Sequence, residues 1–470
     1  MATFRTYDRL LYAKVEATEG TTVTPGNADY IETIDPTFTI TNRTFERNVT
    51  RMSVTPAPAH VTGTGRGDSD GAPSAQCEFT FGVELTGAGH ASSVPNDVPW
   101  GKLLDACGLK FLDTLYRIPL ADPGIATDSA NTYYPWMLRH AENVSTGTTE
   151  YAGGTRVGRL VGDTFYKDPY AYVSRNGASQ AVAGSDEVYG QATDFQINSG
   201  NSKLYLDPSG AGVADRAKAW ATTSDTDLGG AGSTNCNSLT MQMYIAETGQ
   251  FIKMKGARGN VEFQFSSGDR CIMQFTFIGS LVEFNDGTTA PTPTATALEV
   301  APSVVGLSLK LGASSYGDAN AAYYDGTVFS TFSLNLNNEV VLRDSLNDST
   351  GYESSYISGR NPQLTFNPDA RDQTTSYDFW SKLLSGDQTH MEWTLGTDTG
   401  NSFRFKTPAA QFDQIGDGNR DNVMTFDSTV TLTGGDMGSS VLEEPDDTST
   451  ASNLMNKRLG RNNEFVMYYE

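Results

Sequence analysis

The stretch PWGKLLDACG occupies residues 99–108, and a second version of it, FWSKLLSGDQ, occupies residues 379–388. Both contain Trp-x-Lys-Leu-Leu. Pro99 suits the first turn of a helix and Gly108 suits its C-terminal cap. Apolar residues at helical spacing predict one buried face per helix. These duplicated helix-core residues are Trp100, Leu103 and Leu104 in the first copy and Trp380, Leu383 and Leu384 in the second.

The residues around the two helices also match in order. Two alternating, strand-like stretches precede each helix, and a strand–turn–strand unit and a further strand follow it. In the first copy the stretches are 38–51, 77–89, 239–257 and 268–282, and in the second they are 329–345, 361–370, 391–409 and 418–432. The shared order predicts an internal duplication.

The first copy contains about 130 residues that the second copy lacks. These residues, 109–237, are polar, and we expect a partly β insertion that faces outward and is dispensable for the two repeated domains. A Pro-Thr-Ala-rich stretch marks a boundary between the copies. The expected organisation is an N-terminal arm 1–27, a first domain 28–284 with insertion 109–237, a linker 285–303, a second domain 304–440 and a C-terminal arm 441–470.

Composition favours a mainly β protein with many turns. Of the 470 residues, 38% are hydrophobic and only 19% are charged, while aromatic residues are common. The formal charge of −23 argues against nucleic-acid binding through phosphates and against an anionic membrane surface. No run of about 18 apolar residues predicts a membrane span. The first twenty residues lack a signal-peptide core, so we expect synthesis in a cytosol.

Motifs for catalysis and for metal or cofactor binding do not stand out. The four cysteines are widely spaced, and the four histidines form no shared motif. The loop GTGRGDSDG and the acidic turn DGNRDN are explained better by turn chemistry than by phosphate or calcium binding. We therefore expect no enzyme activity, no cofactor and no metal, although a glycosidase is neither excluded nor supported.

Several phrases resemble the tail tube proteins, or major tail proteins, of long, non-contractile-tailed bacteriophages. The resemblance covers about two thirds of the chain, and its specificity comes from the joint order of structural phrases. These phrases are LLYAKVEATEGTTVTPGNADYI (10–31), FTFGVELTGAG followed by PWGKLLDACG, IKMKGARGNVEFQFSSGDRCIMQFTFIG (252–279), FSLNLNNEVVLRDS and SGRNPQLTF. The insertion 109–237 departs from the family's compact pattern.

The resemblance implies two tandem β-sandwich or open-barrel domains, each with one short helix. It implies stacked rings, trimeric and pseudo-hexameric, that form a hollow tail tube in the virion, after synthesis in the host cytoplasm. The partners that it implies are other copies of the chain, tape-measure and tail-end proteins, and double-stranded DNA that passes through without specific binding. An acidic lumen would repel phosphates.

Two sets of residues follow as candidates for these roles. Glu78, Thr80 and Glu84 alternate along one strand face and are candidates for the lumen, with an ordinary solvated sheet face as the alternative. The arms carry apolar and aromatic residues that we expect to order on neighbouring subunits, the alternative being docking on their own chain. These arm residues are Tyr7, Leu10, Leu11, Tyr12, Phe465, Val466, Tyr468 and Tyr469.

Two other functions stay open. One is a receptor- or glycan-binding β-protein of a virion, with the insertion as its binding module. The other is a secreted polysaccharide-degrading enzyme, which the missing signal peptide disfavours.

Overall fold

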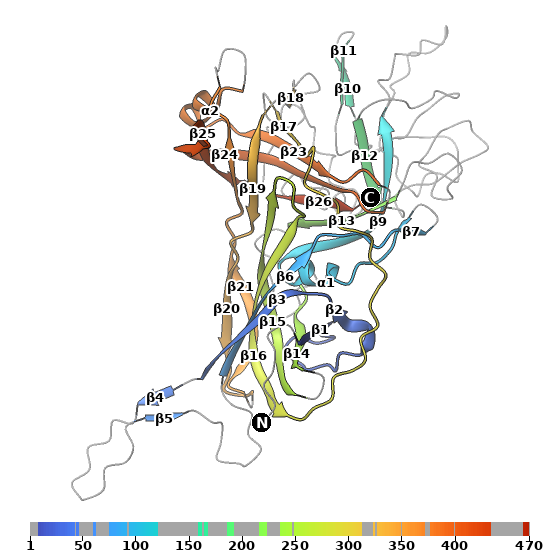
Figure 1. Ribbon diagram of the computed structural model, residues 1–470, viewed down its shortest axis with the longest axis vertical. Coiled ribbons are helices and arrows are strands. Elements are labelled where there is room, and N and C mark those ends of the chain that lie inside the picture. The colour runs from blue at the N-terminus through green and yellow to red at the C-terminus, as the bar shows by residue number, and fades with distance from the viewer. Residues whose placement is uncertain are drawn as a thin grey trace, which may run out of the picture.

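Strands dominate the chain, as its composition predicts, and every strand pairing among the described residues is antiparallel (Figure 1). The computed structural model describes residues 8–42, 44–46, 60–62, 75–91, 94–120, 158–161, 164–167, 186–191, 216–222, 236–246, 249–312, 323–324, 327–348, 350–371, 377–398, 400–433 and 464–469.

Six strands of the first half pair side by side. In β6 (Ala75–Glu84), apolar and polar residues alternate, so that one face of the strand is buried. Cys77, Phe79 and Phe81 are fully buried, and the residues between them are partly exposed. The order across the sheet is β1 (Arg9–Val15), β14 (Leu239–Ile245), β15 (Gln250–Ser266), β16 (Ile272–Asp286), β6 and β3 (Ile34–Asn42).

The second half repeats this order of pairing. The order of its strands across the sheet is β17 (Ser308–Gly312), β23 (Thr389–Leu395), β24 (Phe403–Arg420), β25 (Val423–Leu432), β22 (Gln363–Pro368) and β19 (Phe329–Asn335). The matched sequence phrases therefore correspond to matched strands. The halves share one 18-stranded sheet, because β15 pairs with β19 between them. Their division into two tandem domains stays a prediction.

An equivalent ion pair occurs in each half. Arg270 pairs with Glu84, the last residue of β6, and Arg420 pairs with Asp369, which directly follows β22. Since β6 and β22 hold the same place in the two pairing orders, each arginine ties the end of the strand before the helix to the β15–β16 or β24–β25 hairpin.

The helix α1 (Gly101–Ala106) lies where the sequence places it. Trp100, Leu103 and Leu104 are fully buried. Gly108 follows the helix with φ +82°, in the left-handed region that glycine tolerates best.

The helix α2 (Phe379–Ser385) buries a different face from the expected one. Trp380 is 38% exposed and Leu384 is 83% exposed, so the prediction that they fill a core is wrong in this chain. Leu383 is partly buried. Phe379 takes the core position instead and packs edge-to-face on Phe412. One residue turns a helix by about 100°, which moves the neighbouring Trp380 outward.

The segment 109–237 is not only an outward decoration, which corrects the expectation for its ends. It begins with β9 (Leu109–Leu120) and returns through β13 (Arg216–Thr222), whose Trp220 is buried against Trp100. β12 (Asp186–Gln191) extends the sheet beside β9. A separate pair consists of β10 (Gly158–Val161) and β11 (Thr164–Lys167).

Both chain ends pack on their own chain where the structure describes them. Leu10, Leu11 and Tyr12 belong to β1, and the last two of these are fully buried. At the other end, β26 (Val466–Tyr469) lies between β13 and β24. Phe465, Val466, Tyr468 and Tyr469 are fully buried, because β26 fills the gap between two strands. The expectation that these residues order on neighbours is therefore corrected; Tyr7 lies outside the described residues.

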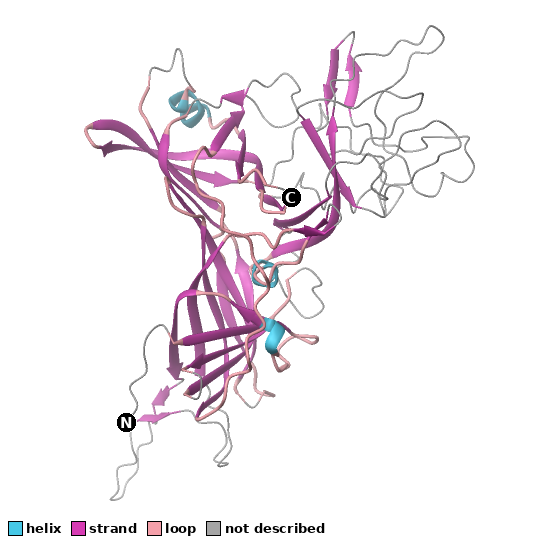
Figure 2. Ribbon diagram, turned by 45° about the vertical axis from the view of Figure 1, so that its right-hand side comes forward, coloured by secondary structure: helices cyan, strands magenta, loops and turns pink. Residues whose placement is uncertain are grey.

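One hairpin leaves the sheet in each half, between equivalent strands. β4 (Thr44–Glu46) and β5 (His60–Thr62) follow β3, and β20 (Glu339–Asp344) and β21 (Tyr352–Gly359) follow β19. The predicted single strand 329–345 is thus two strands, separated where Asn337 has φ +49°. β20 and β21 lie along β15 and β16, whereas β4 and β5 lie beyond the end of the body (Figures 1 and 2).

The remaining described elements are short. They are η1 (Asn27–Asp29), β2 (Tyr30–Ile31), β7 (His90–Ala91), β8 (Val94–Pro95) and β18 (Tyr323–Tyr324). The linker predicted at 285–303 overlaps the end of β16, and residues 287–302 then run without helix or strand.

Candidate functional site

A polar face runs across strands of both halves. Residues that lie directly opposite one another in neighbouring strands share a face of the sheet. One such row crosses five strands, and each member is partly or fully exposed. Its members are Gln264, Ser333, Thr365, Thr429 and Gln414, from β15, β19, β22, β25 and β24.

This polar face lacks cations over most of its extent. None of the six strands β3, β6, β16, β19, β22 and β25 contains a lysine or an arginine. Where the two halves meet, the face forms a hollow of about 600 Å³ whose only charged lining residues are Glu262 and Asp427. Hydroxyl, amide and carboxylate groups carry no positive charge, so a surface made of them does not attract a polyanion.

The three residues predicted for a lumen lie on this same face. Thr80 is opposite Thr276 of β16, and Glu84 is opposite Ile272, which in turn is opposite Gln264. Glu78 lies one row further along. All three are partly exposed, and Glu84 pairs with Arg270 at the rim. The structure thus brings them together on one surface, while their role in a lumen stays a prediction.

Side-chain hydrogen bonds hold the face in shape. The hydroxyls of Ser333 and Thr365 lie 2.8 Å apart across β19 and β22. The Asn260 amide donates to the Asn335 side chain over 2.8 Å. These cross-strand pairs fix rotamers, so the surface is presented as one ordered wall. The alternating polar residues of 363–368 and 423–432 carried this signal in the sequence, and the sequence reasoning missed it.

The β20–β21 hairpin covers one end of the face. Ser280 lies on the same side of β16 as Thr276, yet it is fully buried and donates to Thr350 over 2.8 Å. Lys255 forms an ion pair with Asp348. Burial alone would raise the pKa of Asp348, but its bonds from Lys255 and Thr350 lower that pKa below its usual value.

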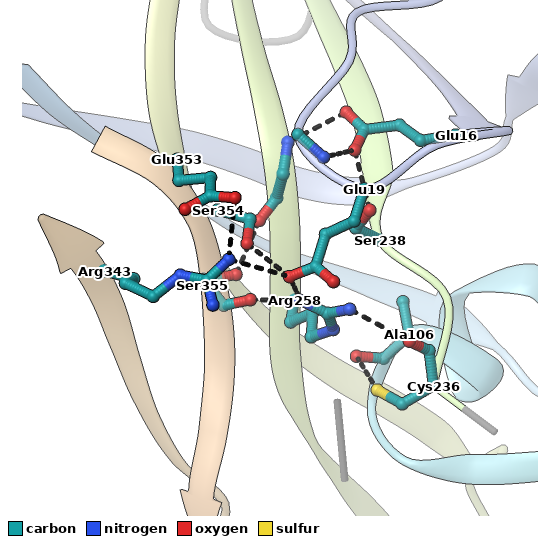
Figure 3. A network of polar contacts seen from close by, with 12 residues as sticks. Glu16, Glu19, Ala106, Cys236, Ser238, Arg258, Arg343, Glu353, Ser354 and Ser355 are labelled. Carbon is teal, nitrogen blue, oxygen red and sulfur yellow. Dashed lines mark hydrogen bonds and ion pairs between the residues drawn. The ribbon is translucent and has the colours of Figure 1, made fainter. Parts of the chain in front are cut away.

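A polar network centred on Arg258 fastens the hairpin (Figure 3). Arg258 is 2% exposed and donates to the backbone oxygens of Ser355 and Cys236, the latter over 3.1 Å. Its guanidinium also lies 3.1 Å from Glu19. Ser355 in turn donates to the Gly256 carbonyl over 2.6 Å. The buried Arg258 side chain therefore connects the β20–β21 hairpin and the N-terminal loop to the sheet of the first half.

The carboxyl of Glu19 is tuned by this network. Burial acts to raise the pKa of Glu19, but the hydrogen bond from Ser354 and the charges of Arg258 and Arg343 outweigh burial and lower it. The carboxylate form is thus favoured in the folded chain. The sequence analysis did not identify this network, because its members come from four separate segments.

A second cluster joins the halves around α1. The rings of Trp100 and Tyr469 have centroids 6.4 Å apart, and Phe403 stacks on Tyr469 at 5.3 Å. The Tyr469 hydroxyl accepts from Ala88 N at 2.8 Å and donates to the Gly400 carbonyl at 3.0 Å. Burial raises the pKa of Tyr469 to about 12, so the hydroxyl stays protonated and keeps both bonds.

No family model matches the chain, and a search of curated proteins finds no similar protein. Among the residues that the structure describes, no helix is both long and apolar enough to cross a membrane.

Proposed function

We propose that the chain is a structural subunit of a hollow tube, of the kind that forms the tail tube of long, non-contractile-tailed phages. The observation that carries the proposal is the polar face, which lacks cations over most of its extent and continues across both halves of the sheet. A channel wall for double-stranded DNA must not condense phosphates, and condensation on a protein surface needs lysine and arginine. The face meets that requirement.

Two sheet edges support assembly into rings. Within the chain, β15 of the first half pairs with β19 of the second half. The equivalent strands, β24 and β3, are the remaining edges: in the described part of the chain β3 pairs with β6, and residues 411–420 of β24 pair with β25. Pairing β24 of one subunit with β3 of the next repeats the internal contact. Such a head-to-tail contact forms a ring when its rotation closes.

Three chains with two similar halves each would give six similar units around the ring. This is the trimeric, pseudo-hexameric arrangement that the family resemblance implies, in a virion tail whose subunits are made in the host cytoplasm. The same edge pairing would hide backbone groups that otherwise invite aggregation. Tape-measure and tail-end proteins are the further partners that this function implies.

Negative-stain electron microscopy of the purified chain, together with sedimentation velocity, tests the proposal. We expect rings or hollow tubes whose formation increases with protein concentration. Subunits that stay monomeric at every concentration contradict it, and monomers with measurable affinity in a glycan-binding assay favour the receptor- or glycan-binding function instead.

A further inference from the structure

The strands that lead into the two hairpins align residue by residue. FTITNRTFER (38–47) matches LNLNNEVVLR (334–343), with apolar residues at equivalent positions and Asn42 on Asn338. The structure supports this alignment, because Phe38 pairs with Phe79 in β3–β6 as Leu334 pairs with Leu364 in β19–β22. Each asparagine therefore stands where the chain leaves the sheet to enter its hairpin.

Asn338 makes a contact between the two halves. Its side-chain amide donates to the Cys107 carbonyl over 2.7 Å and to the Gly259 carbonyl over 3.0 Å. Cys107 caps the C-terminal end of α1, and Gly259 belongs to β15. Asn338 thus links the second half to the end of the first-half helix and to the strand beside it.

The second half contains an equivalent helix end that lies beside an equivalent strand. Gly386 caps the C-terminal end of α2, and a Cβ atom built on it would lie 3.5 Å from the Gln411 side chain of β24. The end of α2 therefore lies beside β24, as the end of α1 lies beside β15. This is also where β24 becomes the unpaired edge named above.

The surface of α2 next to this site is incompletely covered. Trp380 and Leu384 are exposed, whereas Trp100 of α1 is buried, in part by Phe403 and Tyr469 of the second half. Residues of the second half thus cover Trp100, whereas Trp380 and Leu384 of the second half keep exposed surface in the described part of the chain. A second copy of the chain is a partner that could cover this surface in the same way.

We propose that Asn42 of one subunit binds the C-terminal end of α2 and the adjoining edge of β24 in a second subunit, as Asn338 binds α1 and β15 within the chain. The β4–β5 hairpin of the first subunit then lies on β24 and β25 of the second subunit. This contact is equivalent to the one that β20–β21 makes with β15 and β16 within a single chain. The proposal rests on the proposed ring assembly and names the residue contact that closes it.

Two matched variants test this contact. Asn338→Ala removes an internal contact, so it lowers the unfolding temperature of the subunit. Asn42→Ala leaves the unfolding temperature unchanged and raises, at least tenfold, the protein concentration needed for rings in sedimentation velocity. Wild-type assembly by Asn42→Ala, or an equal loss of subunit stability in both variants, overturns the proposal.

Chemical crosslinking gives a second readout that does not depend on stability. The four native cysteines are buried and so are shielded from the reagent, and Asn42→Cys and Gln411→Cys each add one new thiol. Mixed with a short bis-maleimide, the two variants yield a covalent dimer that neither variant yields alone. If the wild-type chain forms tubes but the mixed cysteine variants give no covalent dimer, the contact is refuted and the proposed function stands. A wild-type chain that never assembles refutes both.

Discussion

The indole ring of Trp220 packs on that of Trp100, with 5.0 Å between their centroids. The Trp220 ring nitrogen donates to the Gly101 carbonyl over 3.2 Å, and a Cβ atom on Gly101 would lie only 2.8 Å from the indole. A residue of the long segment 109–237 therefore completes the core around α1. This relationship makes that segment part of the fold.

Trp220→Ala is expected to destabilise the chain by about 3 to 5 kcal/mol, the usual cost of removing a buried aromatic side chain. Trp380→Ala is the matched control, because Trp380 is 38% exposed and its loss should cost less in the isolated subunit than the loss of the fully buried Trp220. Urea unfolding monitored by circular dichroism measures both. Equal stability of the two variants would show that Trp220 does not support the core.

Deletions within the long segment separate its structural ends from its middle. Replacing residues 117–215 with a Gly-Ser turn keeps β13 paired to the start of β9, since Arg216 lies opposite Tyr116. We expect this variant to fold. Replacing all of 109–237 removes Trp220 and one partner of β26, and we expect it to be insoluble or to lack a cooperative transition on heating. A cooperative, wild-type transition of the larger deletion contradicts this assignment.

Acid should weaken the contacts through which Glu19 of the N-terminal loop binds Arg258 and Ser354. The pKa of Glu19 is lower in the folded chain than its ordinary value of 4.5. Its ionised form therefore contributes stability that is present above that ordinary value and is lost as the pH falls through the lowered one. Glu19→Gln removes this contribution, so the variant loses less stability than wild type between about pH 6 and about pH 3.

Glu353→Gln is the control for this pH dependence. Glu353 also pairs with Arg343, but its side chain is 49% exposed, and exposed pairs contribute little. Denaturant midpoints measured across the pH range compare the three proteins. An identical acid response of wild type and Glu19→Gln would show that the Arg258 network does not depend on this carboxylate.

Leu384 provides a test of the exposed α2 surface. Leu384→Ser should change subunit stability by about 0.5 kcal/mol or less, because its side chain is 83% exposed in the isolated chain. If a second subunit covers this surface, the same substitution reduces assembly, which light scattering against protein concentration measures. Unchanged assembly would place Leu384 outside the contact between subunits.

The order of the strands along the chain was largely predictable, because period-two alternation is strong and the alternating stretches follow one another in the same order in both copies. The core face of α2 was not. Phe379 and Leu383 are four residues apart, and so are Trp380 and Leu384, so helical spacing alone fits either pair. In the first copy the residue before the tryptophan is Pro99, which offers no competing aromatic side chain, and the pattern predicted the buried face correctly.

Long-range pairing explains the other differences. Trp220 is one of many aromatic residues in the polar segment 109–237, and Phe465–Tyr469 follow a polar stretch, so nothing local reveals that β13 and β26 lie side by side. The Arg258 network likewise depends on segments that only the tertiary fold brings together. For the polar face, the sequence predicted one strand through Glu78, Thr80 and Glu84, and the pairing of β15 with β19 extends that face across both halves.

Adding positive charge to the polar face tests its proposed role most directly. Thr365 and Thr429 lie opposite each other on β22 and β25 and point away from the core. The double variant Thr365→Lys/Thr429→Lys is expected to fold, because a lysine on an exposed sheet position buries no charge. It places two cations on a wall that otherwise attracts no phosphate. We therefore expect it to bind duplex DNA at low salt where wild type does not, and to lose that binding steeply as salt rises.

The control for this variant is Thr294→Lys/Thr296→Lys, which adds the same two side chains to the exposed stretch between the two halves. A mobility-shift assay with a short duplex, repeated at several salt concentrations, compares the three proteins, and assembled tubes are assayed in the same way by co-sedimentation. In tubes the difference should be larger, because a lysine that faces a narrow channel meets DNA phosphates on every side, whereas one on the outer surface stays screened by solvent. Equal DNA binding by Thr294→Lys/Thr296→Lys and by Thr365→Lys/Thr429→Lys would show that net charge alone governs binding, and would contradict the proposal that the polar face lines the channel.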